Sequence, residues 1–293
     1  MSNVIRSISS IIDKDYKSFA MYTLEGRALP SYIDGLKPTG RKLVYSMINQ
    51  YKGKKIKVSE LGSSIPSYGY HHGESSAMGA VVTLSADWQN NVPIFKGYGS
   101  FGTRLIQSAA APRYIFCDLN PDFSKYFCDE NVCTSRNDVE HPEPQQYLPI
   151  IPWVLVNGVE GIAVGFACRY LPHNPKDIAK ACIKAVKGTL KSNHVIPVTF
   201  PGFTGTITQE EHNKIVSYGT VTRVKRNTWV ISEVPWGFDR EKFFLTMESM
   251  MDSGKIQDFE DECADSKFKF TVKMDGTQDE KCAKDPIAYF KLS

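Results

Sequence analysis

The pair Arg113-Tyr114 is the strongest candidate for chemistry in this sequence. A tyrosine phenol can attack phosphorus and form a phosphotyrosine linkage, and a neighbouring guanidinium can bind the phosphate oxygens through two hydrogen bonds. The pair follows three alanines, which allow another backbone to come close, and Pro112, which forces the residue before it into an extended conformation. The alternative is that Tyr114, which precedes an Ile-Phe dipeptide, is a half-buried packing residue of a β-strand, in which neighbouring side chains face opposite sides.

Positive charge is concentrated around this pair. Residues 27–115 contain eleven Lys/Arg and four Asp/Glu, whereas the whole chain has a formal net charge of only +3. A basic segment within an otherwise balanced chain is typical of a polyanion-binding site. The alternative is a solvated lysine face, which would account for residues 52–57 on their own.

Helices are expected both before the basic segment and at its start. Residues 3–25 carry apolar side chains at helical spacing, and this stripe needs a partner surface in this chain or in another subunit. Thr39 is expected to cap a helix that starts near Gly40, with Arg41 and Lys42 in its first turn. Cations at that position oppose the helix dipole, so they favour a phosphate in front of the helix.

A histidine pair precedes a further helix. A short helical patch lies at 59–61, and after Gly73 apolar residues recur at helical spacing to residue 88, which together fit a helix-turn-helix. His71 and His72 would then stand at the head of the third helix, where it would meet DNA. A zinc site is a poor interpretation because adjacent histidines diverge. Surface histidines without a function remain the alternative.

A glycine-rich stretch at residues 97–102 links this helix to the tyrosine. It lacks the GK[ST] signature and the strand–loop–helix frame of a phosphate loop. We therefore interpret it as the loop of a β-wing that places Lys96 and Arg104 near backbone phosphates, with Tyr114 on the following strand.

The remainder of the chain alternates between strands and helices. Residues 154–164 have the pattern of a hairpin around Asn157-Gly158, in which Ile162 would ordinarily pack inward. Asn174 is expected to cap a helix that Pro175 opens. Further expected elements are a strand–turn–strand at 220–234, a helix at 240–251 and an acidic segment at 258–265 that is either a metal site or, more simply, a solvated loop.

Composition narrows the class of protein. The chain has 293 residues, of which 42% are hydrophobic, which suits about two globular domains. No apolar run reaches the ~18 residues of a membrane span. Seven cysteines without a CxxC pair indicate reduced, intracellular thiols, so we expect a cytoplasmic protein.

Five motifs in order carry a family resemblance: GRALPSYIDGLKPTGRKLVYSM, SYGYHHGESS, GYGSFGTR, AAAPRYIF and LPIIPWVLVNGVEGIAVGF. Their order and spacing resemble the breakage-reunion region of type IIA DNA topoisomerases, which include gyrase, topoisomerase IV and eukaryotic topoisomerase II. The resemblance covers nearly all of residues 10–240. The short separate chain is similar to the medium subunit of T-even phage enzymes, which suggests a phage or viral relative. For a phage protein the expected location is the cytoplasm of the host cell, and for a protein of a eukaryotic virus the alternative is a viral factory or the nucleus.

The resemblance assigns roles by position. Tyr114 matches the nucleophile that becomes joined to the 5′ end of the cut strand, and Arg113 matches the arginine that steadies the transition-state phosphate. Ile162 matches the wedge residue that kinks DNA. Ser75 falls where gyrases carry a quinolone-contacting serine, although the acidic partner expected four residues later is Gly79 here. The expected DNA contacts are Arg27, Lys37, Arg41, Lys42, His71, His72, Lys96 and Arg104.

The implied fold is α+β: an N-terminal helical arm (1–25), a winged-helix DNA-cleavage domain (26–145) and an α/β tower domain (146–293) without the family's coiled coil. The chain has neither an ATPase signature nor a TOPRIM metal motif, and an unperturbed phenol with a pKa of about 10 needs help to ionise. The resemblance therefore implies that a partner ATPase/TOPRIM subunit holds Mg²⁺ and ATP, while this chain forms a homodimer on double-stranded DNA. Alternatives are a helix-turn-helix protein without chemistry and a decoy that docks on another topoisomerase.

Overall fold

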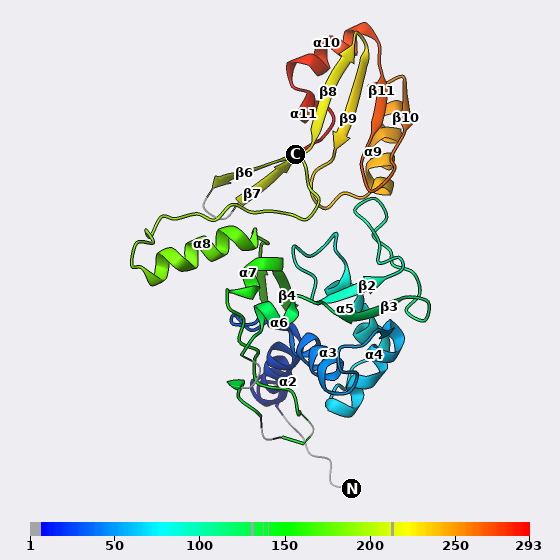
Figure 1. Ribbon diagram of the computed structural model, residues 1–293. Helices are drawn as coiled ribbons and strands as arrows, with labels where there is room; N and C mark the ends of the chain where they lie inside the picture. The colour runs from blue at the N-terminus through cyan, green and yellow to red at the C-terminus, as the bar shows by residue number, and fades with distance from the viewer. Residues whose placement is uncertain (1–6, 130–131, 137, 140, 212–213) are drawn as a thin grey trace. The chain divides into compact units, whose positions relative to one another are not determined.

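A computed structural model describes residues 7–129, 132–136, 138–139, 141–211 and 214–293 (Figure 1). The chain divides into two compact units. The first comprises the described residues of Met1–Gly99 and Ala111–Thr199, and the second comprises Ser100–Ala110 and Phe200–Ser293. The predicted boundary lay at residue 146, whereas residues 146–199 belong to the first unit. Hydrogen bonds join this segment to the first unit: the Asn91 side chain donates to the carbonyls of Val156, His173 and Thr199.

The first unit opens with a helical arm of alternating α and π turns: α1 (Ile8–Ser10), η1 (Ile11–Tyr16), α2 (Lys17–Thr23) and η2 (Leu24–Ala28). The predicted helix at 3–25 is thus confirmed from residue 8, and residues 3–6 lie outside the described part. The apolar stripe is exposed rather than buried, with Ile8 at 74% and Phe19 at 61% exposure. The first buried residue of the arm is Ala28.

A helical layer follows the arm. It contains α3 (Pro38–Asn49), α4 (Val58–Ser64), the short η3 (Ile65–Tyr68) and α5 (Glu74–Ser85). Leu43, Leu61 and Val81 are completely buried where these helices pack. The predicted start of α3 was wrong: the helix begins at Pro38 with Lys37 at the N-cap, because proline at the first helical position lacks only an N–H that would be unpaired anyway.

A three-stranded antiparallel sheet completes this layer. β1 (Ile56–Lys57), β2 (Phe95–Tyr98) and β3 (Phe116–Leu119) lie in the order β1-β3-β2. Phe95 and Cys117 are completely buried on the core face of the sheet. The side chains that alternate with them, which include Tyr98 and Phe116, therefore lie on the outer face.

The remaining elements of the first unit are α6 (Phe123–Tyr126), α7 (Trp153–Asn157), the hairpin β4–β5 (Val159–Ala163 and Phe166–Tyr170) and α8 (Pro175–Val186). A hairpin around Asn157-Gly158 was a wrong prediction. Asn157 ends α7, and its side chain exchanges hydrogen bonds with the backbone of Val92. The hairpin turns instead at Val164-Gly165. The predicted cap of α8 is confirmed, because the Asn174 side chain accepts from the Lys176 N–H.

The second unit is built on a four-stranded sheet in the order β10-β11-β9-β8 (Figure 1). Phe243 and Met247 of the helix α9 (Arg240–Asp252) are completely buried against Ile231 and Phe270 of the sheet. The predicted strand–turn–strand at 220–234 and helix at 240–251 are both confirmed. The elements are β6 (Thr206–Glu211), β7 (Lys214–Tyr218), β8 (Thr220–Lys225), β9 (Thr228–Glu233), α9 (Arg240–Asp252), β10 (Asp258–Asp261), β11 (Phe270–Lys273), α10 (Gly276–Lys284) and α11 (Pro286–Tyr289).

Among the described residues, no helix combines the length and the apolar character that crossing a membrane requires.

Candidate active site and nucleic-acid interface

Tyr114 is presented to solvent, with 68% of its surface exposed. The Arg113 guanidinium carbon lies 4.9 Å from the centroid of the Tyr114 ring, a cation–π contact worth about 0.5–1 kcal/mol at an exposed site. The two side chains therefore share one face, and the half-buried packing alternative is wrong. The arrangement holds an exposed phenol and an exposed guanidinium side by side.

Tyr114 lies in a turn rather than on the expected strand, because the neighbouring carbonyls are already bonded. The first-turn N–H groups of α4 on Val58 and Ser59 donate to the carbonyls of Ile115 and Pro112, at 3.1 and 3.2 Å. Such N–H groups have no partner within their own helix. The sheet ladder consequently starts only at Phe116.

Ile115, which follows the turn of Arg113 and Tyr114, holds that turn in place through its buried side chain. Its side chain is 1% exposed, and a Cβ added at Gly99 would lie 2.8 Å from the Ile115 Cγ2. Gly99 also has a φ of +106°, in the region that favours glycine. Gly99 therefore leaves room for the Ile115 side chain to pack directly after the turn of Arg113 and Tyr114.

Arg27 and the histidine pair form a second group at the start of α5. The His72 ring packs edge-on against the Tyr70 ring, with centroids 5.3 Å apart. Partial burial lowers the pKa of His72, and the charges of Arg27 and His71 lower it further. A cationic cluster that disfavours its own protonation is suited to an anion, whose arrival relieves the repulsion. Arg27 and His71 are exposed.

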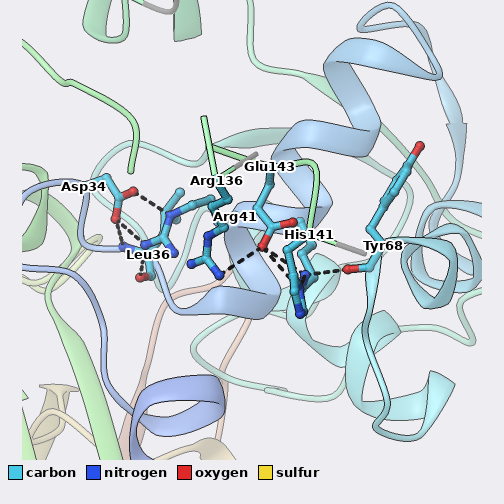
Figure 2. Close-up of polar contacts among 8 residues, drawn as sticks. Asp34, Leu36, Arg41, Tyr68, Arg136, His141 and Glu143 are labelled. Atoms are coloured by element: carbon cyan, nitrogen blue, oxygen red, sulfur yellow. Dashed lines mark hydrogen bonds and ion pairs between the residues drawn. The ribbon is translucent and has the colours of Figure 1, made fainter. Parts of the chain in front are cut away.

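Arg41 does not reach the surface, contrary to what a direct DNA contact requires. It is 3% exposed, and its Nε donates to Asp34 Oδ2 at 2.9 Å (Figure 2). Asp34 also accepts from the backbone N–H groups of Leu36 and Tyr147. In this structure Arg41 therefore stabilises the turn before α3.

Lys42 is buried in the same way. It is 4% exposed, and its Nζ lies 2.9 Å from Glu143 Oε1 and 2.8 Å from His141 Nδ1; it also donates to the Tyr68 carbonyl. Figure 2 shows Glu143 with His141 and Arg136 around it. Burial lowers the pKa of Lys42, and Glu143 opposes that shift. The lysine thus ties the segment around Glu143 to the residues just before the histidine pair.

Arg104 is enclosed within the second unit instead of facing a phosphate. Its Nη1 lies 2.8 Å from Glu233 Oε2, and its guanidinium carbon lies 5.1–5.3 Å from the ring centroids of Phe203, Trp236 and Phe268. The residue is 5% exposed. Its neighbour Leu105 belongs to the hydrophobic core of this unit. Arg104 therefore anchors the loop of residues 100–110.

Ile162 is 70% exposed, so the alternative that it packs within its own hairpin is wrong. The hairpin is seated through Gly161, where an added Cβ would lie 2.5 Å from the Ala28 carbonyl oxygen. This close approach places the strand of Ile162 against η2, directly beside Arg27. The apolar tip of the hairpin continues in Val164 and Phe166, at 42% and 47% exposure.

The remaining site residues predicted from the sequence lie at or near the surface. Lys37 is the half-buried N-cap residue of α3, Lys96 is exposed on β2, and Ser75 is exposed in the first turn of α5. In the acidic segment, Glu260 pairs with Lys273 at 2.6 Å and Asp261 with Arg240 at 2.7 Å. Within the described ranges, no group of three or more His, Cys, Asp or Glu side chains could hold a metal ion.

Sequence reasoning missed the carboxylates Asp34, Glu143 and Glu233. Asp34 had a local signal in its Asp-Gly turn, which is typical of a side chain that bonds its own backbone. Glu143 and Glu233 gave none, since they lie 101 and 129 positions from the cations that they bind.

The fold and these motifs define the class of protein. A family model for the A subunit of DNA gyrase/topoisomerase IV matches residues 27–293, and the chain belongs to this family. It is 37% identical over 272 residues to the DNA topoisomerase medium subunit of Enterobacteria phage T4, in an alignment that covers 92% of this chain and 61% of that one. It is 35% identical over 264 residues to DNA topoisomerase 2-beta of Gallus gallus, across 85% of this chain and 16% of the relative.

A solved structure gives the same result for the fold. The DNA-binding, cleavage and re-ligation domain of Plasmodium falciparum topoisomerase II superposes with a TM-score of 0.88 at 27% identity, over 96% of this chain and 40% of that one. The chain thus spans less than two thirds of the length of each of these relatives.

Proposed function

We propose that this chain is the DNA-binding and cleavage part of an ATP-dependent type II DNA topoisomerase. The observation that carries the proposal is the exposed Tyr114 with the Arg113 guanidinium against its ring, in a chain of this family. The helices α3 to α5 with the sheet β1-β3-β2 support a winged-helix domain, and the sheet unit that follows supports a tower domain.

The proposed reaction is a transesterification at a backbone phosphate. The phenolic oxygen of Tyr114 forms a bond to phosphorus while the bond from phosphorus to the 3′ oxygen breaks. The phenol loses a proton and the departing 3′ oxygen gains one, so the number of phosphodiester bonds is conserved and the step can run backwards to religate. Arg113 binds the phosphate oxygens as charge develops on them.

The basic residues that are exposed or half-buried would hold the duplex around this phosphate. We assign Arg27, Lys37, His71, His72 and Lys96 to phosphate or groove contacts, with the Ile162 side chain as the wedge between base pairs. Arg41 and Lys42 support this surface indirectly, because Arg41 fixes the turn before α3 and Lys42 bonds the Tyr68 carbonyl just before the histidine pair. Arg104 anchors the loop of residues 100–110 within the second unit. Ser75 stays a candidate drug contact on the exposed start of α5.

The described residues do not fit a magnesium site, because among them no three His, Cys, Asp or Glu side chains are grouped so that they could hold a metal ion. We therefore propose that Mg²⁺ and ATP are bound by a partner ATPase/TOPRIM subunit, and that two copies of this chain cut the two strands. The sequence expectation of a cytoplasmic location accords with this assignment.

The test is a Tyr114→Phe variant assayed with the metal-bearing partner, Mg²⁺ and plasmid. After denaturation with detergent, we expect the unaltered chain to yield linear DNA with bound protein and the variant to yield none, while both bind DNA equally. Tyr32→Phe is the matched control, because Tyr32 is 77% exposed in the same unit. Adducts from the Tyr114→Phe variant would refute the assignment. A lack of adducts from the unaltered chain would favour a binding protein without chemistry.

A further inference from the structure

The outer face of the sheet β1-β3-β2 carries lysines around two aromatic rings. Lys57 pairs with Phe116, and Phe116 pairs with Tyr98, in the register of the three strands. Lys96 lies on the same face of β2, because side chains two positions apart share a face. Lys55 precedes β1 with the same parity. We call Lys55, Lys57, Lys96, Tyr98 and Phe116 the outer face.

The rings hold the ammonium groups in place. Lys55 Nζ lies 4.1 Å from the centroid of the Tyr98 ring and 5.4 Å from that of Phe116, and Lys96 Nζ lies 5.3 Å from the Tyr98 centroid. The negative face of an aromatic ring attracts an ammonium group at such distances. Lys55 and Lys96 are thus both held near the Tyr98 ring. An anion that binds there contacts two positive charges whose side chains have already lost much of their conformational freedom.

The only carboxylate of these strands, Asp118, also lies on the outer face, but it bonds to the Tyr98 hydroxyl and not to a lysine. Asp118 stands opposite Lys96 in the register, yet its Oδ2 accepts the Tyr98 hydroxyl at 2.6 Å, and its Oδ1 is buried without a partner. Among the side chains that the structure describes, none forms an ion pair with Lys55, Lys57 or Lys96. This contrasts with Arg41, Lys42 and Arg104, each of which is neutralised by a buried carboxylate.

We propose that this outer face binds the sugar–phosphate backbone of the duplex that the chain cleaves, with Lys55 and Lys96 each contacting a phosphate. The inference rests on the proposed function and extends it to β1, whose lysines carried no assignment. Phe116 follows Tyr114 by two residues on the same short segment, so the face continues the nucleophile's turn. Ammonium groups over rings recognise charge but not base sequence, which suits an enzyme that must grip DNA beside the cut.

The test measures how duplex affinity depends on salt. Each phosphate contact contributes about −0.9 to the slope of log K against log salt, so the double variant Lys55→Gln/Lys96→Gln should have a slope shallower by about 1.8. A fourfold rise in salt would then weaken the variant about twelvefold less than the unaltered chain. Exposed side chains of this kind change stability little, which an unfolding midpoint verifies.

The matched control is Lys187→Gln/Lys191→Gln, which removes the same charge from exposed positions in the same unit, at and beyond the end of α8. We expect its slope to equal that of the unaltered chain. An unchanged slope for the Lys55/Lys96 variant, or an equal loss in the control, would overturn the proposal. An adduct assay on the unaltered chain separates the two claims. If that chain forms covalent adducts while the Lys55/Lys96 variant keeps an unchanged salt slope, this inference fails and the proposed function stands.

Discussion

Replacing Arg104 by methionine tests whether this residue is an anchor or a DNA contact. The guanidinium lies against three aromatic rings, and Glu233 is 3% exposed. Methionine fills similar space without charge. The change therefore leaves a buried carboxylate with only the Thr204 and Val234 groups that already donate to it.

The expected loss is large. Removing one partner of a buried ion pair typically costs about 3–5 kcal/mol, against a total domain stability of about 5–15 kcal/mol. For a unit of this size the midpoint of thermal unfolding should fall by roughly 10–20 °C. A second change, Glu233→Gln in the same chain, removes the unpaired charge and should restore more than half of the lost stability.

Calorimetry on the full chain gives the unfolding transition, and hydrogen exchange in β8 and β9 assigns the loss to the second unit. The affinity for duplex DNA is measured in parallel across salt concentrations. Two results together would refute the anchoring role of Arg104. The free energy of unfolding would change by no more than about 0.5 kcal/mol, and the slope of log K for DNA binding against log salt would become shallower by about 0.9. Arg104 would then contact a phosphate, as the sequence predicted.

Two further predictions concern the interface. In the folded chain without DNA, the pKa of His72 lies below its ordinary value. As the pH drops through about 6.5, the unfolded chain therefore takes up a proton at His72 before the folded chain does, and the free energy of unfolding falls. DNA phosphates should raise that pKa, so that binding strengthens between pH 7 and 6; NMR titration with and without duplex checks this, and an unmoved pKa would contradict it. Ile162→Ala should leave the unfolding midpoint nearly unchanged, because the side chain is 70% exposed, yet abolish bending of a doubly labelled duplex measured by energy transfer; undiminished bending would remove the wedge role.

Local sequence patterns were enough to predict several helices and strands of this protein and its family. The Asn174-Pro175 start of α8, the strand–turn–strand at 220–234 and the third helix after Gly73 were all readable, because capping, turn chemistry and apolar periodicity act over a few residues. The order and spacing of five motifs, of which one contains Arg113-Tyr114, likewise identified the family. The error at Tyr114 has a long-range cause: the carbonyls of Pro112 and Ile115 accept hydrogen bonds from Ser59 and Val58 of α4, so the strand starts only at Phe116.

Which cations face the solvent was decided only by the tertiary structure. Arg41, Lys42 and Arg104 look in sequence like the exposed Arg27 and Lys96, since charge alone does not reveal burial. Lys42 and Arg104 meet carboxylates 101 and 129 positions away, and no local pattern encodes such pairs. Burying a charge is stable only with a partner in good geometry, and that partner exists only once the chain has folded.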